Sequence, residues 1–313
     1  QKPRADSPHT SHISRYTAEP RFPERERKKP ERYAASAVRK AVGGAKMRQR
    51  RRIRKRVQEL YKLYSKNAGR DPTRKEIGEL LADEIPLTTG GATWAADNKT
   101  VFYTRKDPQT LRSYQVYRHV LGTPVEDDAL VFEETDETFS CGVYRTKSDE
   151  YLVIYTSQTL SQEYRVLKAD DPMGEWRVVQ PRERDLEYGI SHYGDHFYIV
   201  TNLDAKNFRL MKTPVDATTK DNWEEVIPHR DDVLLEGIDI FKDYLVVEER
   251  QEGLNQIRIK TWDGSKDEYL EFNDPAYTAG TRSNPDFDTE ILRFGYSSMT
   301  TPSRPRSVSY THL

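Results

Sequence analysis

The 313-residue sequence has a single cysteine, Cys141. It therefore has no partner for a disulfide within the chain and no Cys-x-x-Cys pair that could bind a metal ion. This excludes a disulfide-stapled fold and a zinc ribbon. Because unpaired cysteines are typical of reducing compartments, we expect a cytoplasmic protein.

Long apolar runs are also missing. No stretch approaches the ~18 consecutive apolar residues that cross a bilayer, and residues 1–4 (Gln-Lys-Pro-Arg) lack the apolar character of a secretory signal. We expect no membrane partner. The low apolar share of 35% and the charged share of 32% fit thin sheets with solvated edges, or a globular part joined to a disordered part.

The motifs of catalysis are absent from the sequence. The nucleophile of a hydrolase lies in the pattern G-x-S-x-G. The nearest approach is residues 189–194, but the glycine that should follow Ser191 by two positions comes one position too late. The seven histidines include no H-E-x-x-H and no metal-binding spacing with Cys141, and no glycine-rich phosphate loop is present. We expect no catalytic residue, metal site or cofactor in this chain.

Charge divides the chain into two parts. Residues 1–75 contain 24 Lys and Arg against 7 Asp and Glu, a net +17, whereas the remaining residues contain 26 against 44, a net −18. Residues 1–35 are poor in aliphatic side chains, so disorder is expected there. Residues 34–66 have apolar side chains at helical spacing and predict one basic amphipathic helix. Binding of nucleic acid through its phosphate groups is an alternative role for this helix. We favour the interpretation that the segment has no nucleic-acid partner.

After the predicted helix, which ends before Gly69, the hydrophobic period changes from 3.6 to 2, and strand-like segments recur. A first series and a second series each repeat at intervals of 44 to 51 residues, and a third series has nearly the same period. The first series is 100–104, 151–156, 197–201, 244–248 and 291–295; the second is 114–118, 164–168, 208–212 and 256–260; the third is 129–134, 175–179 and 222–226.

A repeat of this length with three or four strands is typical of a propeller blade. A β-sandwich or barrel is the competing fold, but it is not expected to return three strand series at one shared period. We therefore predict an all-β, incomplete β-propeller of about five blades out of an expected seven, with full units between residues 89 and 273. Because the ring is not closed, the arc should be only marginally stable and should expose its terminal edges.

Several segments resemble the propeller domain of the prolyl oligopeptidase family, and within it the oligopeptidase B group. The strongest are Gln-Pro-Arg-Glu-Arg at 180–184, Ala-Lys-Asn-Phe-Arg-Leu-Met at 205–211 and Phe-Gly-Tyr-Ser-Ser-Met-Thr-Thr-Pro at 294–302. The resemblance also makes 76–85 a turn and a strand, although Asp71 and Glu76 alone would suggest the start of a helix.

This resemblance implies a two-domain serine peptidase. In the family, the propeller covers an α/β-hydrolase domain and admits only short peptides to a Ser-His-Asp site, and the oligopeptidase B group cleaves after Lys or Arg. The implied partners are therefore short basic peptides and a hydrolase domain that is missing from this chain. The negative charge of the propeller fits basic peptides, but it also fits ordinary solubility.

The resemblance places the strand of Phe102 beside the active-site cavity, so Phe102 is a candidate substrate-lining aromatic, with a place in the blade core as the alternative. Tyr155 and Ser157 on the next blade are weaker candidates. A stand-alone propeller that binds a protein or peptide is the alternative function. We expect three regions: a basic segment at 1–75, the propeller at 76–302, and an unrelated tail at 303–313 whose residues 308–313 look like translated sequencing adaptor.

Overall fold

The computed structural model describes residue 85 and residues 87–312. The predicted disordered segment and basic helix lie outside these residues, as does nearly all of the predicted strand at 76–85. The described residues form β-strands and three single-turn 3-10 helices, η2 (Val125–Asp127), η3 (Lys220–Asn222) and η4 (Tyr310–His312). No helix in this part of the chain is long and apolar enough to cross a membrane.

The strands form five antiparallel sheets in chain order, four of four strands and a last one of three. Sheet one contains β1 (Thr93–Trp94), β2 (Thr100–Lys106), β3 (Ser113–Val120) and β4 (Ala129–Glu133). Sheet two contains β5 (Ser140–Arg145), β6 (Tyr151–Gln158), β7 (Ser161–Lys168) and β8 (Arg177–Val178). Sheet three contains β9 (Tyr188–Tyr193), β10 (His196–Thr201), β11 (Arg209–Pro214) and β12 (Glu224–Ile227).

Sheet four contains β13 (Val233–Ile240), β14 (Tyr244–Gln251), β15 (Leu254–Thr261) and β16 (Asp267–Tyr269). Sheet five contains β17 (Tyr277–Thr281), β18 (Ile291–Ser298) and β19 (Arg304–Ser309). Within each sheet the strands lie side by side in sequence order, which is the up-and-down meander of a propeller blade.

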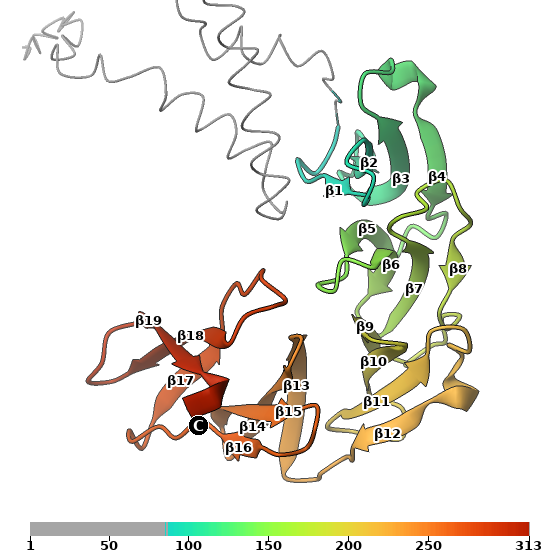
Figure 1. Ribbon diagram of the computed structural model, residues 1–313. Helices are drawn as coiled ribbons and strands as arrows, with labels where there is room; N and C mark the ends of the chain where they lie inside the picture. Colours follow the sequence, from blue (N-terminus) through green and yellow to red (C-terminus); the bar gives the residue numbers. More distant parts are fainter. Residues whose placement is uncertain (1–84, 86, 313) are drawn as a thin grey trace, which may run out of the picture.

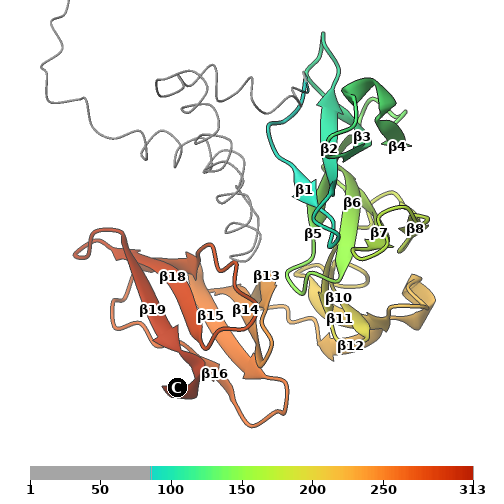
Figure 2. The same ribbon diagram turned by 45° about the horizontal axis from the view of Figure 1, so that its top comes forward.

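The sheets follow one another along an open arc (Figures 1 and 2). In Figure 1 the first strand of each of sheets one to four lies toward the hollow of the arc and the last strand toward its outside. The chain is therefore a partial β-propeller, as the repeat predicted. Its five sheets correspond to the expected number of blades.

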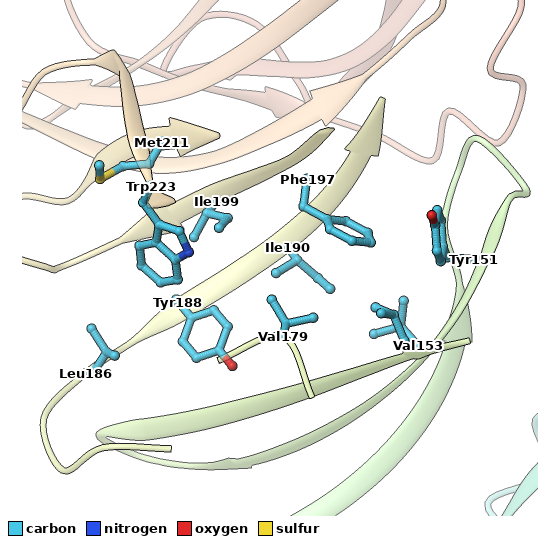
Figure 3. Close-up of a cluster of buried hydrophobic side chains, with 11 residues drawn as sticks. Tyr151, Val153, Val179, Leu186, Tyr188, Ile190, Phe197, Ile199, Met211 and Trp223 are labelled. Carbon is cyan, nitrogen blue, oxygen red and sulfur yellow. The ribbon is translucent and has the colours of Figure 1, made fainter. Parts of the chain in front are cut away.

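The hydrophobic core consists of layers between consecutive sheets. Each of the four buried clusters takes its side chains from two neighbouring sheets. In Figure 3, Tyr151 and Val153 of sheet two face Ile190 and Phe197 of sheet three. A blade alone would leave both of its faces in water, so stacking is what stabilises each sheet.

Strand β6 shows why the sequence has continuous apolar runs here. Tyr151 and Val153 pack toward sheet three, whereas Leu152 and Ile154 pack toward sheet one, and all four are at most 3% exposed. Alternate side chains of a strand point to opposite faces, so a strand covered on both faces has a nearly continuous run of apolar residues.

The three strand series correspond to three positions within a blade. The first series forms the second strands, β2, β6, β10, β14 and β18; the second forms the third strands, β3, β7, β11 and β15; the third forms the outer strands, β4, β8 and β12. The blade-length repeat is thus confirmed strand by strand.

Residues 304–309, which the sequence places in the tail, form β19 and pair with β18 at six positions. This segment therefore supplies the third strand of sheet five. The division of the chain at residues 75 and 302 stays a sequence-based prediction.

Candidate functional site

A cavity of about 540 Å³ lies against the inner strands of three consecutive sheets. Strand β9 runs through its wall, with residues of β5 and β6 on one side and of β13 on the other. Ser157 and Gln162 flank the turn between β6 and β7, and Glu187 directly precedes β9. The cavity is therefore lined at the end of the blades where the second strands stop and the third strands begin.

Four tyrosines dominate the wall: Tyr144, Tyr155, Tyr164 and Tyr188. They contact one another in two pairs, with ring centroids 6.1 Å apart for Tyr144 and Tyr155, and 5.1 Å apart for Tyr164 and Tyr188. Sheets two and three thus share one aromatic surface.

Gly142 sets the position of the Tyr155 ring. The two residues are direct cross-strand partners on β5 and β6. A Cβ added to Gly142 would lie 2.5 Å from Tyr155 Oη and 2.6 Å from two ring carbons. The ring therefore lies across the β5 backbone, in space that any other residue would fill.

Hydrogen bonds hold the aromatic wall to the strands around it. The Tyr144 hydroxyl donates to the Ile190 carbonyl at 3.3 Å, and the Tyr188 hydroxyl donates to the Gln180 carbonyl. Burial raises the pKa of Tyr144 and of Tyr188, and burial together with Tyr155 raises the pKa of Tyr164 to about 12. These three phenols stay neutral at physiological pH.

The charged side chains that line the cavity are both acidic, Glu187 and Glu236. Glu236 accepts hydrogen bonds from Arg250 Nε at 2.7 Å and from Asn255 Nδ2 at 2.8 Å. Glu187 has a weaker contact, with Asn202 Nδ2 at 3.4 Å from its Oε1. A cavity with aromatic rings and an incompletely neutralised carboxylate favours a cation over an anion.

The predicted cavity residues are divided between this cavity and the core. Tyr155 and Ser157 line the cavity. Phe102 is 0% exposed and packs edge-on against Trp176, with ring centroids 5.5 Å apart, in the layer between sheets one and two. Phe102 therefore belongs to the blade core in this structure and not to the cavity wall.

The serine and histidine of the 189–194 segment lie on β9 and point apart. Ser191 lines the cavity, whereas His192 is 2% exposed and its Nδ1 lies 2.8 Å from Ser148 Oγ. The nucleophile of such a hydrolase lies on a strand-to-helix turn and is hydrogen-bonded to a base. This segment is instead a regular strand. Among the described residues there is also no group of three or more His, Cys, Asp or Glu side chains that could hold a metal ion.

Sequence reasoning missed Tyr144, Tyr164, Tyr188 and Glu187. These residues come from three strands and a loop, and only the stacking of two sheets brings them together. One signal could have identified most of the inner strands. Four of the five, β5, β9, β13 and β17, have a glycine, at intervals of 43 to 48 residues: Gly142, Gly189, Gly237 and Gly280.

Comparison with known proteins gives a consistent result. The profile of the family described as "Prolyl oligopeptidase, N-terminal beta-propeller domain" matches residues 72–311. Dipeptidyl aminopeptidase BI of Pseudoxanthomonas mexicana is 42% identical over 229 residues, 73% of this chain and 31% of that protein. Protease 2 of Moraxella lacunata is 32% identical over 228 residues, 72% of this chain and 32% of that protein.

Solved structures of oligopeptidase B are similar in fold as well. The closed form from Trypanosoma brucei with covalently bound antipain superposes with a TM-score of 0.69 at 27% identity, covering 75% of this chain and 34% of that chain. The enzyme from Leishmania major gives 0.68 at 28% identity, covering 73% and 33%. The chain spans about a third of the length of the proteins it matches.

Proposed function

The chain belongs to the prolyl oligopeptidase family through its N-terminal β-propeller domain, and we propose that it is the substrate-gating part of a serine-type oligopeptidase. The observation that carries the proposal is the match of residues 72–311 to a peptidase-family propeller, over a chain that folds into the corresponding arc of blades. In this role the blades enclose a passage that admits short peptides and keeps folded proteins out.

The proposed reaction is cleavage of short peptides after Lys or Arg. Two features support it: the similarity to oligopeptidase B structures, and the net charge of −18 over residues 76–313, which would raise the local concentration of basic peptides. A cytoplasmic location is part of the proposal and is supported by the single, buried cysteine.

The proposed protein partner is a hydrolase domain that supplies the Ser-His-Asp site, since this sequence has no nucleophile motif. Exposed apolar side chains support a docking face at the turns between second and third strands. Leu111, Leu160 and Met299 lie in these turns of sheets one, two and five, and are 62%, 47% and 95% exposed. The cavity is lined at this same end of the blades.

The test is to express the coding sequence that continues beyond residue 313 together with this chain. The longer protein should hydrolyse short Arg- or Lys-containing peptides, a serine-reactive inhibitor should abolish the activity, and folded protein substrates should stay intact. The chain of 313 residues alone is the control and should be inactive. A longer product with no inhibitor-sensitive peptidase activity would refute the proposal.

A stand-alone propeller that binds a peptide or protein is the second candidate function. It is favoured by one observation: the cavity of about 540 Å³ is formed by this chain without a second domain. A stop codon directly after residue 313 in the genomic sequence, together with peptide binding by the chain alone, would select this function over the first.

A further inference from the structure

The tyrosine-lined cavity has a composition that suits a positive charge. Its wall presents four phenol rings, which have electron-rich faces, together with two serines and a glutamine that are polar and uncharged. No Lys or Arg is among its lining residues, so nothing in the wall would repel a cation. Recognition of ammonium and guanidinium groups commonly uses such aromatic surfaces.

Glu187 and Glu236 are not equivalent within this wall. The Glu236 carboxylate already interacts with Arg250, with Oε1 2.5 Å from Nη2, and accepts a hydrogen bond from Asn255. The Glu187 carboxylate lies within reach of an uncharged amide, Asn202 Nδ2 at 3.4 Å. Glu187 is thus the carboxylate with capacity left for charge-assisted hydrogen bonds to a ligand.

The backbone around Glu187 is held in place. Its own N–H donates to Asn202 Oδ1 at 2.9 Å, and its carbonyl accepts the Thr201 hydroxyl at 2.8 Å. The N–H of the next residue, Tyr188, donates to Gln162 Oε1 at 3.1 Å, which ties sheet three to sheet two. Such a fixed loop lowers the entropy cost of placing the carboxylate at a binding site.

We propose that this cavity is a subsite for the Arg or Lys side chain of a bound peptide, with the guanidinium or ammonium group paired to Glu187 and its aliphatic stem packed against the tyrosine rings. The inference rests on the proposed peptide-binding function and adds a position on the propeller where one side chain of the peptide is recognised. The aliphatic stem of Lys or Arg suits an aromatic wall and the charged head suits a carboxylate.

The first test uses the unaltered chain of 313 residues and two blocked tripeptides, acetyl-Gly-Arg-Gly-amide and the same peptide with citrulline in place of arginine. Citrulline keeps the shape and removes the charge. Calorimetric titration should show about tenfold tighter binding of the arginine peptide, the equivalent of one charge-assisted interaction of about 1.4 kcal/mol. Equal affinity for the two peptides would overturn the inference.

The second test uses Glu187→Gln, which keeps the shape of the side chain, removes its charge and replaces one acceptor oxygen with an amide NH2 donor. Affinity for the arginine peptide should fall about tenfold, to the level of the citrulline peptide, and citrulline binding should not change. Glu268→Gln is the matched control, because Glu268 is an exposed residue on the outer strand β16 and loses the same charge. A fall of equal size in both variants would mean that the total charge, and not the cavity, attracts the peptide.

These results separate the subsite from the peptidase proposal. If the longer protein hydrolyses arginine peptides but Glu187→Gln binds them normally, the subsite is refuted and the peptidase function stands. If the binding of this chain depends on Glu187 but the longer protein hydrolyses no peptide, the subsite stands and the peptidase function is refuted.

Discussion

The Nζ atom of Lys147 lies 2.6 Å from Oδ1 of Asp239, although the two residues belong to sheets that are not neighbours. Lys147 is in the turn between β5 and β6 of sheet two, and Asp239 is on β13 of sheet four. The ammonium group also lies 3.2 Å from the centroid of the Phe241 ring. The ion pair therefore links sheets two and four past sheet three, and it helps to fix the curvature of the arc.

Asp239→Asn should destabilise the chain by about 1–3 kcal/mol, because it leaves the ammonium of Lys147 largely buried with a weaker partner. Only 18% of the Lys147 side chain and 23% of the Asp239 side chain are exposed. Urea unfolding at neutral pH measures the change. Glu224→Gln is the control, since its pair with Lys212 is solvated and should contribute less than about 0.5 kcal/mol. Equal effects of the two substitutions would mean that the link between sheets two and four contributes no stability.

Gly142→Ala should lower the free energy of unfolding by about 1–3 kcal/mol and should weaken peptide binding, because the new methyl group displaces the Tyr155 ring. Gly237→Ala on β13 is the matched control for stability, because no heavy atom lies within 4 Å of the added Cβ. Gly237 lines the cavity, so the peptide affinity of Gly142→Ala is compared with that of the unaltered chain. Thermal unfolding of both variants and peptide titration of Gly142→Ala check the prediction. If Gly142→Ala behaves like Gly237→Ala, the Tyr155 ring is not held by that glycine.

Phe102→Ala should cost about 3–5 kcal/mol of stability, as is usual when a fully buried phenylalanine is truncated in a core. The milder Phe102→Leu should cost less than about 1.5 kcal/mol and leave peptide affinity unchanged. Tyr155→Leu, in contrast to Phe102→Leu, should reduce peptide affinity. Loss of peptide binding in a folded Phe102→Leu protein would place Phe102 in the site after all.

The stability of the chain should fall as the pH drops below about 6.5, in part because of His192. Burial, and to a smaller extent Lys168, lowers the pKa of this histidine, which packs against Tyr151 with ring centroids 4.7 Å apart. A histidine with a lowered pKa in the folded state stabilises the protein above the unfolded-state pKa, and that contribution is lost as the pH falls through the interval below it.

His192→Asn should make the chain less stable at pH 7.5 and should reduce the loss of stability between pH 7.5 and 5.5, measured by urea unfolding across that range. His196→Asn on the neighbouring strand β10 is the control and should keep the acid-sensitive loss, because His192 is still present. An unchanged pH profile in His192→Asn would contradict the assignment.

The blade repeat is visible in the sequence because of local geometry. A strand covered on both faces is apolar over nearly the whole covered stretch, so 151–154 and its counterparts appear as short apolar runs. Since every blade repeats the same order of strands, these runs recur at one period. The absence of G-x-S-x-G is likewise a property of the sequence alone.

The sequence could not decide which strand residues face the cavity. Phe102 and Val153 are each the third residue of a second strand, and both are buried in the core. Tyr155 is two positions further along the same face of β6, opposite Gly142, and lines the cavity. The types of these residues do not show which of them lines the cavity. Their positions along the strand, inside or beyond the packed layer, do.

The sequence by itself therefore determined the all-β class, the length and order of the blades, the family resemblance and the lack of a nucleophile motif, because each depends on residues close together in the chain. Only the tertiary structure decided that Glu187 lines the same cavity as tyrosines of sheet two, that Phe102 is core, and that Lys147 pairs with Asp239. The stacking of sheets brings together residues from 24 positions apart, as for Tyr164 and Tyr188, to 92 positions apart, as for Lys147 and Asp239, and neither composition nor period encodes which of their side chains meet.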